Sequence, residues 1–351
     1  MGNVFIKKGK KVNNREGELE MKAMVMNEFG NPDVFVKQEV DEPDLQPGYV
    51  KIRVMASCVN PIDTKIRSGL VLAATPDFPA VLHGDAAGTI VEVSSDVTDF
   101  KVGEDVFALG GGVRGHCGAL AEYMVIDERL LAKKPDKISM SQAAALPVVS
   151  LTAWEALVNR GKVKKGDRVL IHGGTGGVGH VAVQLAKYLG AHVTATVSND
   201  EKSAIASKLG ADETINYTKE NVEEYVRRLT DGRGFDLILD TVGKENLDRS
   251  FRAAAPKGVI ISTNTRSTHD LSPLHAKGLT LHVVFLLMPL LSESGREEMG
   301  DTLVKIANLM QTGTLQVLMH DKSYGFTQVS EAHALLEKGE HIGKISLYND
   351  L

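Results

Sequence analysis

The sequence predicts an α/β fold in two lobes, a β-rich lobe and a doubly wound parallel sheet. The chain has 351 residues, 43% of them hydrophobic, which exceeds the length at which one hydrophobic core usually stops growing. Short β-type runs separated by turn residues occupy residues 21–136, whereas strands and helices alternate after about Ser139. Such alternation is typical of a parallel sheet with helices on both faces.

The N-terminal part divides into an extension and a β-rich lobe. Residues 1–20 mix lysines with glutamates around no apolar core, so we predict a disordered extension there. The lobe's first part is predicted to cover residues 21–138. Its expected strands are 22–26, 50–57, 88–93, 105–109 and 121–126.

The second lobe is predicted to cover residues 139–284. Its expected helices are 141–159, 178–189, 201–209, 222–229 and 247–254, and its expected strands are 168–172, 192–197, 213–216, 235–240, 259–263 and 280–285. The tail, residues 285–351, offers a helix 296–311, a strand 315–319, a helix 328–337 and a strand 344–348. We expect this tail to return to the first lobe, so that ligands bind in a cleft between the lobes.

Composition excludes several classes of protein. The formal net charge is −5 and no run of basic residues forms a stripe, so nucleic acid is not the expected partner. Cys58 and Cys117 are too few for a disulfide framework, which favours a reducing, cytoplasmic compartment. The apolar stretch 279–291 is about half a membrane-spanning length and contains His282 and Pro289, so we interpret it as buried strand and loop rather than as a membrane segment.

A glycine-rich turn carries the sharpest chemical signal. It reads Gly174-Thr175-Gly176-Gly177-Val178-Gly179 and stands between the apolar strand 169–171 and an amphipathic helix. In such a turn Gly174 permits a sharp bend, Gly176 permits close approach of a pyrophosphate, and Gly179 permits tight packing of helix on strand. The context predicts a Rossmann dinucleotide site.

The residues after the second strand of this lobe indicate which dinucleotide binds. NAD-binding sequences place an acidic residue there to hold the ribose hydroxyls, whereas this chain has Ser198, followed by Lys202 as a cation and Tyr217 as a cover for the adenosine end. NADPH is therefore the predicted cofactor. The alternative, with Asp200 as the ribose ligand, stays open.

The chain resembles the zinc-independent quinone oxidoreductases, the zeta-crystallin-like branch of the medium-chain dehydrogenase/reductase superfamily. The resemblance runs from Met21 to the end and is carried by the glycine turn and by residues 59–63, 67–69, 151–154 and 209–212. It implies a GroES-like β lobe beside a Rossmann domain, NADPH-dependent reduction of a quinone or an α,β-unsaturated carbonyl compound, and assembly as a homodimer or homotetramer.

The resemblance also implies that no metal takes part. Zinc-dependent relatives carry a cysteine at the position of Asn60, a Gly-His-Glu triplet where this chain reads His83-Gly84-Asp85, and a cysteine near Pro147. A catalytic zinc requires three protein ligands, and none of these positions is filled. Hydride addition to an electron-poor quinone or enone is therefore favoured over the interconversion of alcohols and ketones.

By the same resemblance, Asn60, Pro61 and Ile62 line the nicotinamide pocket, and Asn60 orients and polarises a substrate carbonyl. The implied cofactor contacts are Thr152, Gly174, Gly176, Gly177, Val178, Ser198, Lys202, Tyr217, Val242, Asn264 and Lys344.

Substrate choice is where the chain departs from the family. Lys65 and Val71 stand where family members often carry tyrosines. A pocket with Lys65 loses a stacking surface and gains a cation, which disfavours large polycyclic quinones and favours anionic or smaller enones. Candidates to protonate the product are Asp63, Lys65, Arg114 and His116, with water as an alternative.

Two other functions stay open. One is a structural or RNA-associated protein that binds NADPH with little turnover; the retained motif around Asn60 favours an enzyme. The other is an enoyl thioester reductase, which the missing tyrosine disfavours. The strand 280–285 is predicted to be an exposed edge that pairs across a two-fold axis in a dimer.

Overall fold

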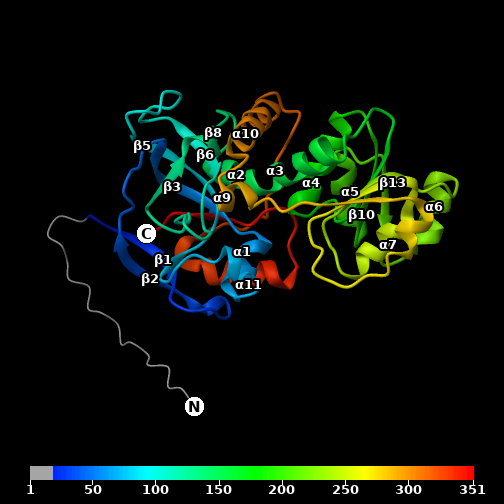
Figure 1. The fold of residues 1–351 in the computed structure, drawn as a ribbon, viewed down its shortest axis with the longest axis horizontal. Coiled ribbons are helices and arrows are strands. Elements are labelled where there is room, and N and C mark those ends of the chain that lie inside the picture. The colour runs from blue at the N-terminus through cyan, green and yellow to red at the C-terminus, as the bar shows by residue number, and fades with distance from the viewer. Residues whose placement is uncertain (1–18) are drawn as a thin grey trace, which may run out of the picture.

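The computed structural model describes residues 19–351, which form two lobes joined side by side (Figure 1). The predicted disordered extension lies outside the described residues except for its last two, of which Glu20 opens the first strand. The N-terminal and C-terminal segments share one lobe, while the middle of the chain forms the other (Figure 1).

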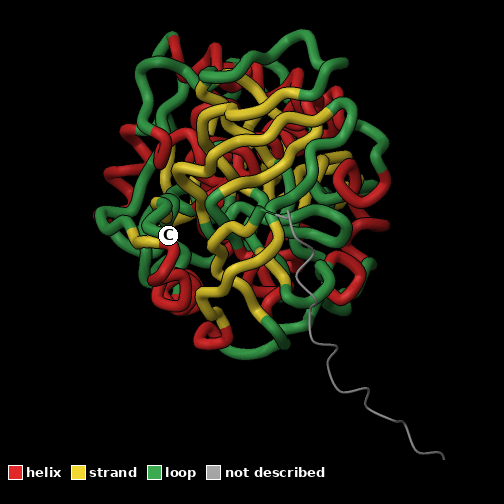
Figure 2. The backbone as a smooth tube through the Cα atoms, turned by 90° about the vertical axis from the view of Figure 1, so that its left-hand side faces the viewer, coloured by secondary structure: helices red, strands yellow, loops and turns green. Residues whose placement is uncertain are grey.

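The first lobe is built on two sheets, whose strands face the viewer in Figure 2. A three-stranded sheet has the order β2-β1-β4, and a seven-stranded sheet has the order β15-β16-β3-β5-β6-β8 with β7 paired to β3. The bounds are β1 Glu20–Met26, β2 Phe35–Asp41, β3 Tyr49–Cys58, β4 Ala80–Val81, β5 Asp85–Val93, β6 Asp105–Leu109, β7 Tyr123–Asp127, β8 Leu131–Lys133, β15 Tyr324–Gly325 and β16 Ser346–Tyr348. Because β15 and β16 come from the tail, the pairings support the proposed return of residues 285–351 to this lobe.

The second lobe is a six-stranded sheet in the order β11-β10-β9-β12-β13-β14, and its described pairs are parallel. The strands are β9 Arg168–Ile171, β10 His192–Val197, β11 Glu213–Asn216, β12 Phe235–Asp240, β13 Ala254–Ser262 and β14 Thr280–Val283. Its helices are α4 Gly177–Tyr188, α5 Asp200–Lys208, α6 Val222–Thr230, α7 Glu245–Ala253 and α8 Ser272–Lys277. The predicted α/β class and the doubly wound parallel sheet are confirmed.

The expected helix 141–159 is divided in the structure. It consists of α2 Met140–Ala144, α3 Pro147–Trp154 and a π-helical turn over Glu155–Arg160. The cause of the first break is Pro147, which has no backbone N–H to continue a helix but is well suited to open the next one at its first position.

The expected strand 315–319 was wrong. Only Met319 forms a β-bridge, with Lys344. The Gln184 side chain instead occupies the backbone of Gln316: its Oε1 accepts from the amide nitrogen at 2.8 Å and its Nε2 donates to the carbonyl at 2.9 Å. Because the N–H and the carbonyl of Gln316 both bond this side chain, Gln316 cannot pair with a neighbouring strand.

The apolar stretch 279–291 is less buried than the sequence suggested. It contains β14 and a short helix, α9 Met288–Ser292, and Val283, Phe285 and Met288 are each about half exposed. Within the described residues β14 pairs only with β13, so one of its edges is open. Among the described helices, none is long and apolar enough to cross a membrane.

A buried ion pair fastens the tail to the first lobe. Arg296 opens the helix α10 Arg296–Gln311 and donates to the carboxylate of Asp127 in β7 at 2.8 Å. Both side chains are only 2% exposed. The Arg296 guanidinium also donates to the carbonyls of Pro289 and Leu290 and to the hydroxyl of Tyr49.

Candidate functional site

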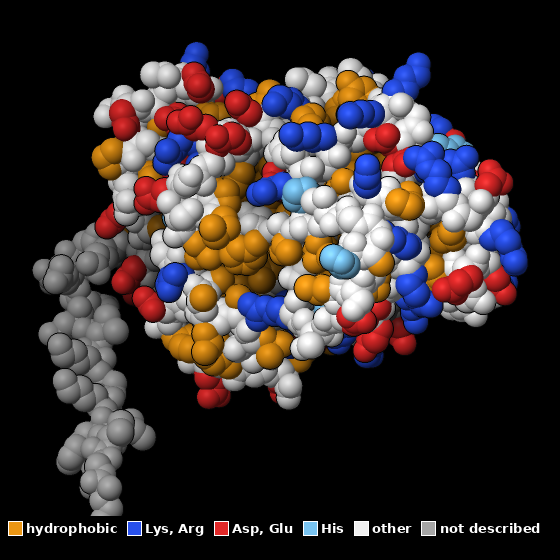
Figure 3. All heavy atoms as spheres, turned by 45° about the vertical axis from the view of Figure 1, so that its right-hand side comes forward, with side chains coloured by type: hydrophobic (Ala, Val, Ile, Leu, Met, Phe, Trp, Pro, Cys, Tyr) orange, Lys and Arg blue, Asp and Glu red, His pale blue; other side chains and the backbone are white. Residues whose placement is uncertain are grey.

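A cleft of about 560 Å³ lies between the two lobes, at the carboxyl ends of the parallel strands. This is where ligands bind in doubly wound sheets. On the face shown in Figure 3, apolar side chains gather in a hollow bordered by Lys or Arg and His side chains. Of the residues singled out in the sequence, the cleft is lined by Asn60, Pro61, Ile62, Lys65, Thr152, Gly176, Gly177, Val178, Val242, Asn264 and Lys344.

The glycine turn brings bare backbone to this cleft. The left-handed φ of 71° belongs to Gly173, so the sharp bend lies one residue earlier than the sequence suggested. Gly174 instead packs against β10, where an added Cβ would lie 2.6 Å from Ala195 Cβ. At Gly179 an added Cβ would lie 2.0 Å from the Gly173 carbonyl oxygen, so only glycine permits this contact.

The cleft side of the same turn stays open. Gly176 is the N-cap of α4, and an added Cβ there would approach only the Gly173 oxygen within 4 Å. The first N–H groups of a helix have no partner within it and favour negative charge. The residues therefore fit the pyrophosphate of a dinucleotide.

Asn60 is held by four groups of the protein. It precedes the helix α1 Pro61–Arg67, and its backbone N–H donates to the Asp63 carboxylate at 2.7 Å. Its Nδ2 donates to Asp85 Oδ2 at 2.8 Å and to the Cys58 carbonyl at 3.3 Å, while its Oδ1 accepts from Lys344 Nζ. Both amide hydrogens are engaged, so a direct bond from Asn60 to a substrate carbonyl would require one of them to exchange partners.

Lys344 is the cation at the centre of this group. It is 3% exposed, and its Nζ donates to the Val59 carbonyl at 3.3 Å and lies 3.7 Å from Asp85 Oδ2. Burial raises the pKa of Asp85, and Lys344 and the Asn60 amide oppose that shift. Burial also raises the pKa of Asp63 to about 7, opposed chiefly by the bond from the Asn60 backbone N–H.

The residues here do not fit a catalytic zinc. Within residues 19–351, no three His, Cys, Asp or Glu side chains come together as metal ligands. Asn60 stands where zinc-dependent relatives resemble this chain but carry a cysteine, and Asp85 stands at the end of the altered triplet. Both face the ammonium of Lys344 instead. A second cation in contact with the same oxygens would be repelled.

A buried chain of hydrogen bonds runs from behind Asp85 to the helix α11 Val329–Lys338. The Ser57 hydroxyl donates to the Asp85 carbonyl at 2.7 Å, so it accepts from His83 Nδ1 at 3.1 Å. His83 Nε2 then accepts from His333 Nε2 at 2.9 Å, and His333 Nδ1 accepts from Arg67 at 3.3 Å. Each imidazole thus has one donor and one acceptor, which requires both to be neutral.

This chain of hydrogen bonds makes the free energy of unfolding depend on pH. Burial lowers the pKa of His83 from 6.5 to about 3 and that of His333 well below 6.5. At these two histidines the folded state therefore binds fewer protons than the unfolded state, so their stabilisation is complete above about pH 6.5 and is lost as pH falls toward 3. We expect each histidine to contribute a loss of about 1.4 kcal/mol per pH unit in urea unfolding, which the raised pKa values of Asp63 and Asp85 oppose.

His333→Gln tests the origin of this dependence. Glutamine can accept from Arg67 and donate to His83 but does not titrate. The variant should be less stable at pH 7 and lose stability less steeply on acidification, and equal slopes for the two proteins would contradict the assignment.

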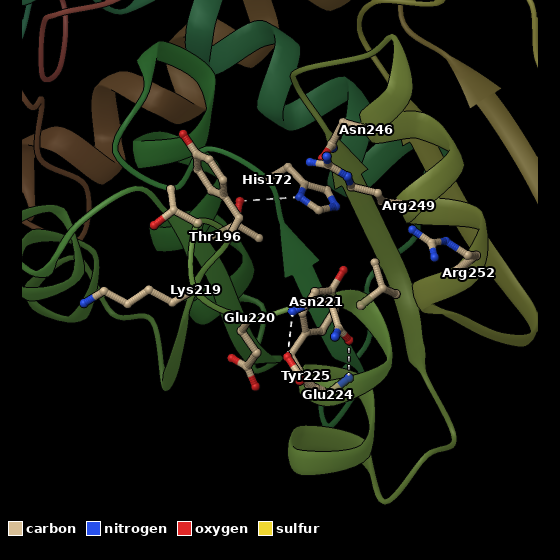
Figure 4. A pocket seen from close by; sticks show the side chains of 13 residues that line it. His172, Thr196, Lys219, Glu220, Asn221, Glu224, Tyr225, Asn246, Arg249 and Arg252 are labelled. Atoms are coloured by element: carbon tan, nitrogen blue, oxygen red, sulfur yellow. Dashed lines mark hydrogen bonds between the residues drawn. The ribbon is translucent and has the colours of Figure 1, made fainter.

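A second pocket, of about 520 Å³, lies at the carboxyl ends of β9 and β10 (Figure 4). His172 and Thr196 line it, with Tyr217 from the loop after β11 and Arg249 from α7. The Thr196 hydroxyl accepts from Gly173 N at 3.0 Å and lies 3.4 Å from His172 Nδ1. His172 Nε2 is buried and has no partner among the described residues, so the pocket offers a polar atom to a ligand.

The residues predicted for the 2′-phosphate lie around the start of α5. The Lys202 backbone N–H donates to the N-cap residue Asn199 at Oδ1, 2.9 Å away, so Lys202 stands in the first turn of α5. The sequence analysis missed His341, which lines the cleft; its pKa is lowered first by burial and then by His320 and Lys202 nearby. Its Nδ1 is buried without a partner among the described residues.

Three predicted proton donors lie outside the cleft lining. Asp63 is buried behind Asn60. His116 lies 3.1 Å from the Leu290 carbonyl and 3.3 Å from Arg296, and Arg114 donates its backbone N–H to Ala74. Of the four candidates only Lys65 lines the cleft.

Comparisons with known proteins match both lobes. Residues 46–136 match the family model described as alcohol dehydrogenase GroES-like domain, and residues 177–305 match the one described as zinc-binding dehydrogenase. The GroES-like and Rossmann assignments are thereby confirmed. The chain is 32% identical to the chloroplastic NADPH-dependent alkenal/one oxidoreductase of Arabidopsis thaliana, over 94% of this chain and 80% of the relative.

Two solved structures have the same fold. An alcohol dehydrogenase superfamily protein from Novosphingobium aromaticivorans is 39% identical with a TM-score of 0.88, covering 93% of this chain and 99% of its own. The Escherichia coli quinone oxidoreductase, solved in complex with NADPH, is 28% identical with a TM-score of 0.83 and covers the same shares.

Proposed function

This chain belongs to the quinone oxidoreductase and alkenal/one oxidoreductase branch of the medium-chain dehydrogenase/reductase superfamily, and we propose that it reduces a quinone or a small α,β-unsaturated carbonyl compound with NADPH and without a metal. The observation that carries the proposal is the cleft, where the open glycine turn, apolar walls and the buried group of Asn60, Asp85 and Lys344 meet.

The residues of the cleft suggest what each contributes. NADPH, when bound, supplies the hydride. Gly176, Gly177 and Val178 hold its pyrophosphate, and Thr152, Val242 and Asn264 contact its nicotinamide half. Lys344 and Asp85 hold the Asn60 amide in one orientation, which fixes the wall against which the reacting ring lies. The apolar side chains Val59, Ile62 and Leu287 exclude water from the reacting atoms.

The second pocket suits the adenine half of the same cofactor. It adjoins the loop that carries Tyr217 and offers the free Nε2 of His172. Ser198, Lys202 and Tyr217 bind the 2′-phosphate in this proposal. Asp200, the alternative ribose ligand, is 90% exposed and lies 3.5 Å from Lys219, which makes it a solvated ion pair rather than a preformed ribose site.

Lys202→Gln tests the cofactor preference. Removal of one cation from a phosphate site should reduce the ratio of kcat/KM for NADPH over NADH by about tenfold or more. Lys208→Gln, in the last turn of the same helix, is the matched control and should leave the ratio unchanged. An unchanged ratio in Lys202→Gln, or a native preference for NADH, would contradict the assignment.

The function is tested by following NADPH oxidation with a small quinone and a short enone, in the presence of a chelator and with NADH in parallel. Turnover that survives the chelator is the expected result. Loss of activity with the chelator would contradict the metal-free mechanism. Tight NADPH binding without turnover of any acceptor would favour a binding protein, and turnover of an enoyl coenzyme A alone would favour a thioester reductase.

We also propose a homodimer formed through β14. The open edge of β14 would pair with the same edge of a second copy across a two-fold axis. The half-exposed side chains of Val283, Phe285 and Met288 would become buried there. Sedimentation equilibrium should give a dimer at micromolar concentration, and a monomer there would contradict this interface. The cytoplasmic location stays a prediction.

A further inference from the structure

Lys65, which lines the cleft, has two other cations near it, and the three come from separate segments. Lys65 comes from α1, Lys244 follows β12, and Arg266 follows β13. The Leu70 amide donates to the Lys65 carbonyl at 2.9 Å, and Arg266 Nη1 donates to the Leu70 carbonyl at 2.8 Å. Arg266, from the second lobe, is therefore fixed to the turn that ends the helix of Lys65.

The segment of Lys244 is fastened to that of Arg266. Asn264 Nδ2 donates to the Val242 carbonyl at 3.0 Å. Gly243, between Val242 and Lys244, packs so closely on Asn264 that an added Cβ would lie 2.2 Å from the Asn264 carbonyl oxygen. The three cations thus stand on backbone segments that contact one another.

These charges are not compensated by the protein. Within the described part of the chain, no carboxylate lies within 4.0 Å of Lys65, Lys244 or Arg266. Glu337, the carboxylate in the cleft lining, is engaged with Arg67 at 2.6 Å.

Lys65 shows the effect of this crowding. It lines the cleft, and its pKa is lowered by burial and by the positive charges of Arg266 and Lys244. Like charges that gather without a counter-ion create a positive potential at the entrance, which attracts an anion.

We propose that Lys65, Lys244 and Arg266 bind a carboxylate carried by the substrate, so that the preferred acceptors are unsaturated carbonyl compounds with an anionic end. The cleft behind the cations is lined by apolar side chains, among them Val148, Val149 and Leu286. An unsaturated carbon chain with one carboxylate matches this arrangement, with the apolar part inside and the charge at the mouth. The inference rests on the proposed reductase function and names its substrate class.

Two compounds of nearly equal shape test the inference. 4-Oxopent-2-enoate carries a carboxylate where hex-3-ene-2,5-dione carries an acetyl group. Because the two differ in intrinsic reactivity, the measured quantity is the ratio of their kcat/KM values, compared between wild type and variants with NADPH as donor.

Lys244→Gln and Arg266→Gln should each lower this ratio about tenfold, mainly through KM of the anion. Arg266→Lys keeps the charge and should retain most of the ratio, whereas Lys101→Gln, an exposed lysine of the first lobe, should leave it unchanged. Rising ionic strength should lower kcat/KM for the oxopentenoate more than for the dione.

Other results would overturn the inference. Equal losses with both compounds would show that the cations support the fold or the cleft rather than a carboxylate. A weaker binding of NADPH to Lys244→Gln at an unchanged ratio would assign the charges to the cofactor. If wild type reduces the dione but shows no dependence of the ratio on these residues, only this inference fails; if it reduces neither compound and no quinone, the proposed function fails and the inference fails with it.

Discussion

Lys344→Met is expected to lower the free energy of unfolding by about 3–5 kcal/mol, the usual effect of removing one partner from a buried ion pair. The substitution removes the cation that faces the fully buried Asp85 among residues 19–351, and it leaves Asn60 Oδ1 without its donor. Because the Asn60 amide then keeps only the bonds of its Nδ2 and is held less firmly, we also expect kcat/KM to fall by about a hundredfold. Urea unfolding and NADPH oxidation measure the two effects.

A double variant separates charge from packing at this position. Asp85→Asn combined with Lys344→Met removes both charges, so it should recover part of the stability lost in Lys344→Met. The activity should stay low, because the donor to Asn60 is still missing. If Lys344→Met alone were as stable as wild type, the ammonium of Lys344 would not balance the charge of Asp85 in the folded protein.

Arg296→Met is expected to destabilise the protein by a similar amount, about 3–5 kcal/mol. Asp127 is 2% exposed and would keep Arg129, itself 41% exposed, as its remaining cation. The carbonyls of Pro289 and Leu290 would also lose a donor, and unsatisfied buried acceptors add to the loss.

The matched control for this pair lies on the surface. Arg233 contacts Asp236 at 2.6 Å and is 66% exposed, so Arg233→Met should change stability by less than about 1 kcal/mol. Equal effects of Arg233→Met and Arg296→Met in urea unfolding would show that burial of the Arg296 pair contributes nothing of its own.

Local patterns in the sequence were sufficient for most of the fold. The alternation after Ser139 predicted the parallel sheet, and the glycine turn predicted both the strand before it and the helix after it. These features depend on neighbours within a few residues. Where a residue far along the chain intervenes, prediction failed, as at 315–319, where the backbone of Gln316 bonds the side chain of Gln184, 132 positions away.

The sequence by itself determined the order of the two lobes, the dinucleotide turn and the replacement of the zinc-binding pattern at Asn60. Only the tertiary structure decided what that replacement does, because Lys344 meets Asn60 across 284 positions and both are buried with Asp85. It likewise brought Lys244 and Arg266 beside Lys65 from segments with no shared pattern. Pairing of charges depends on distance in space and on exclusion of water, and neither can be deduced from the spacing of residues along a chain.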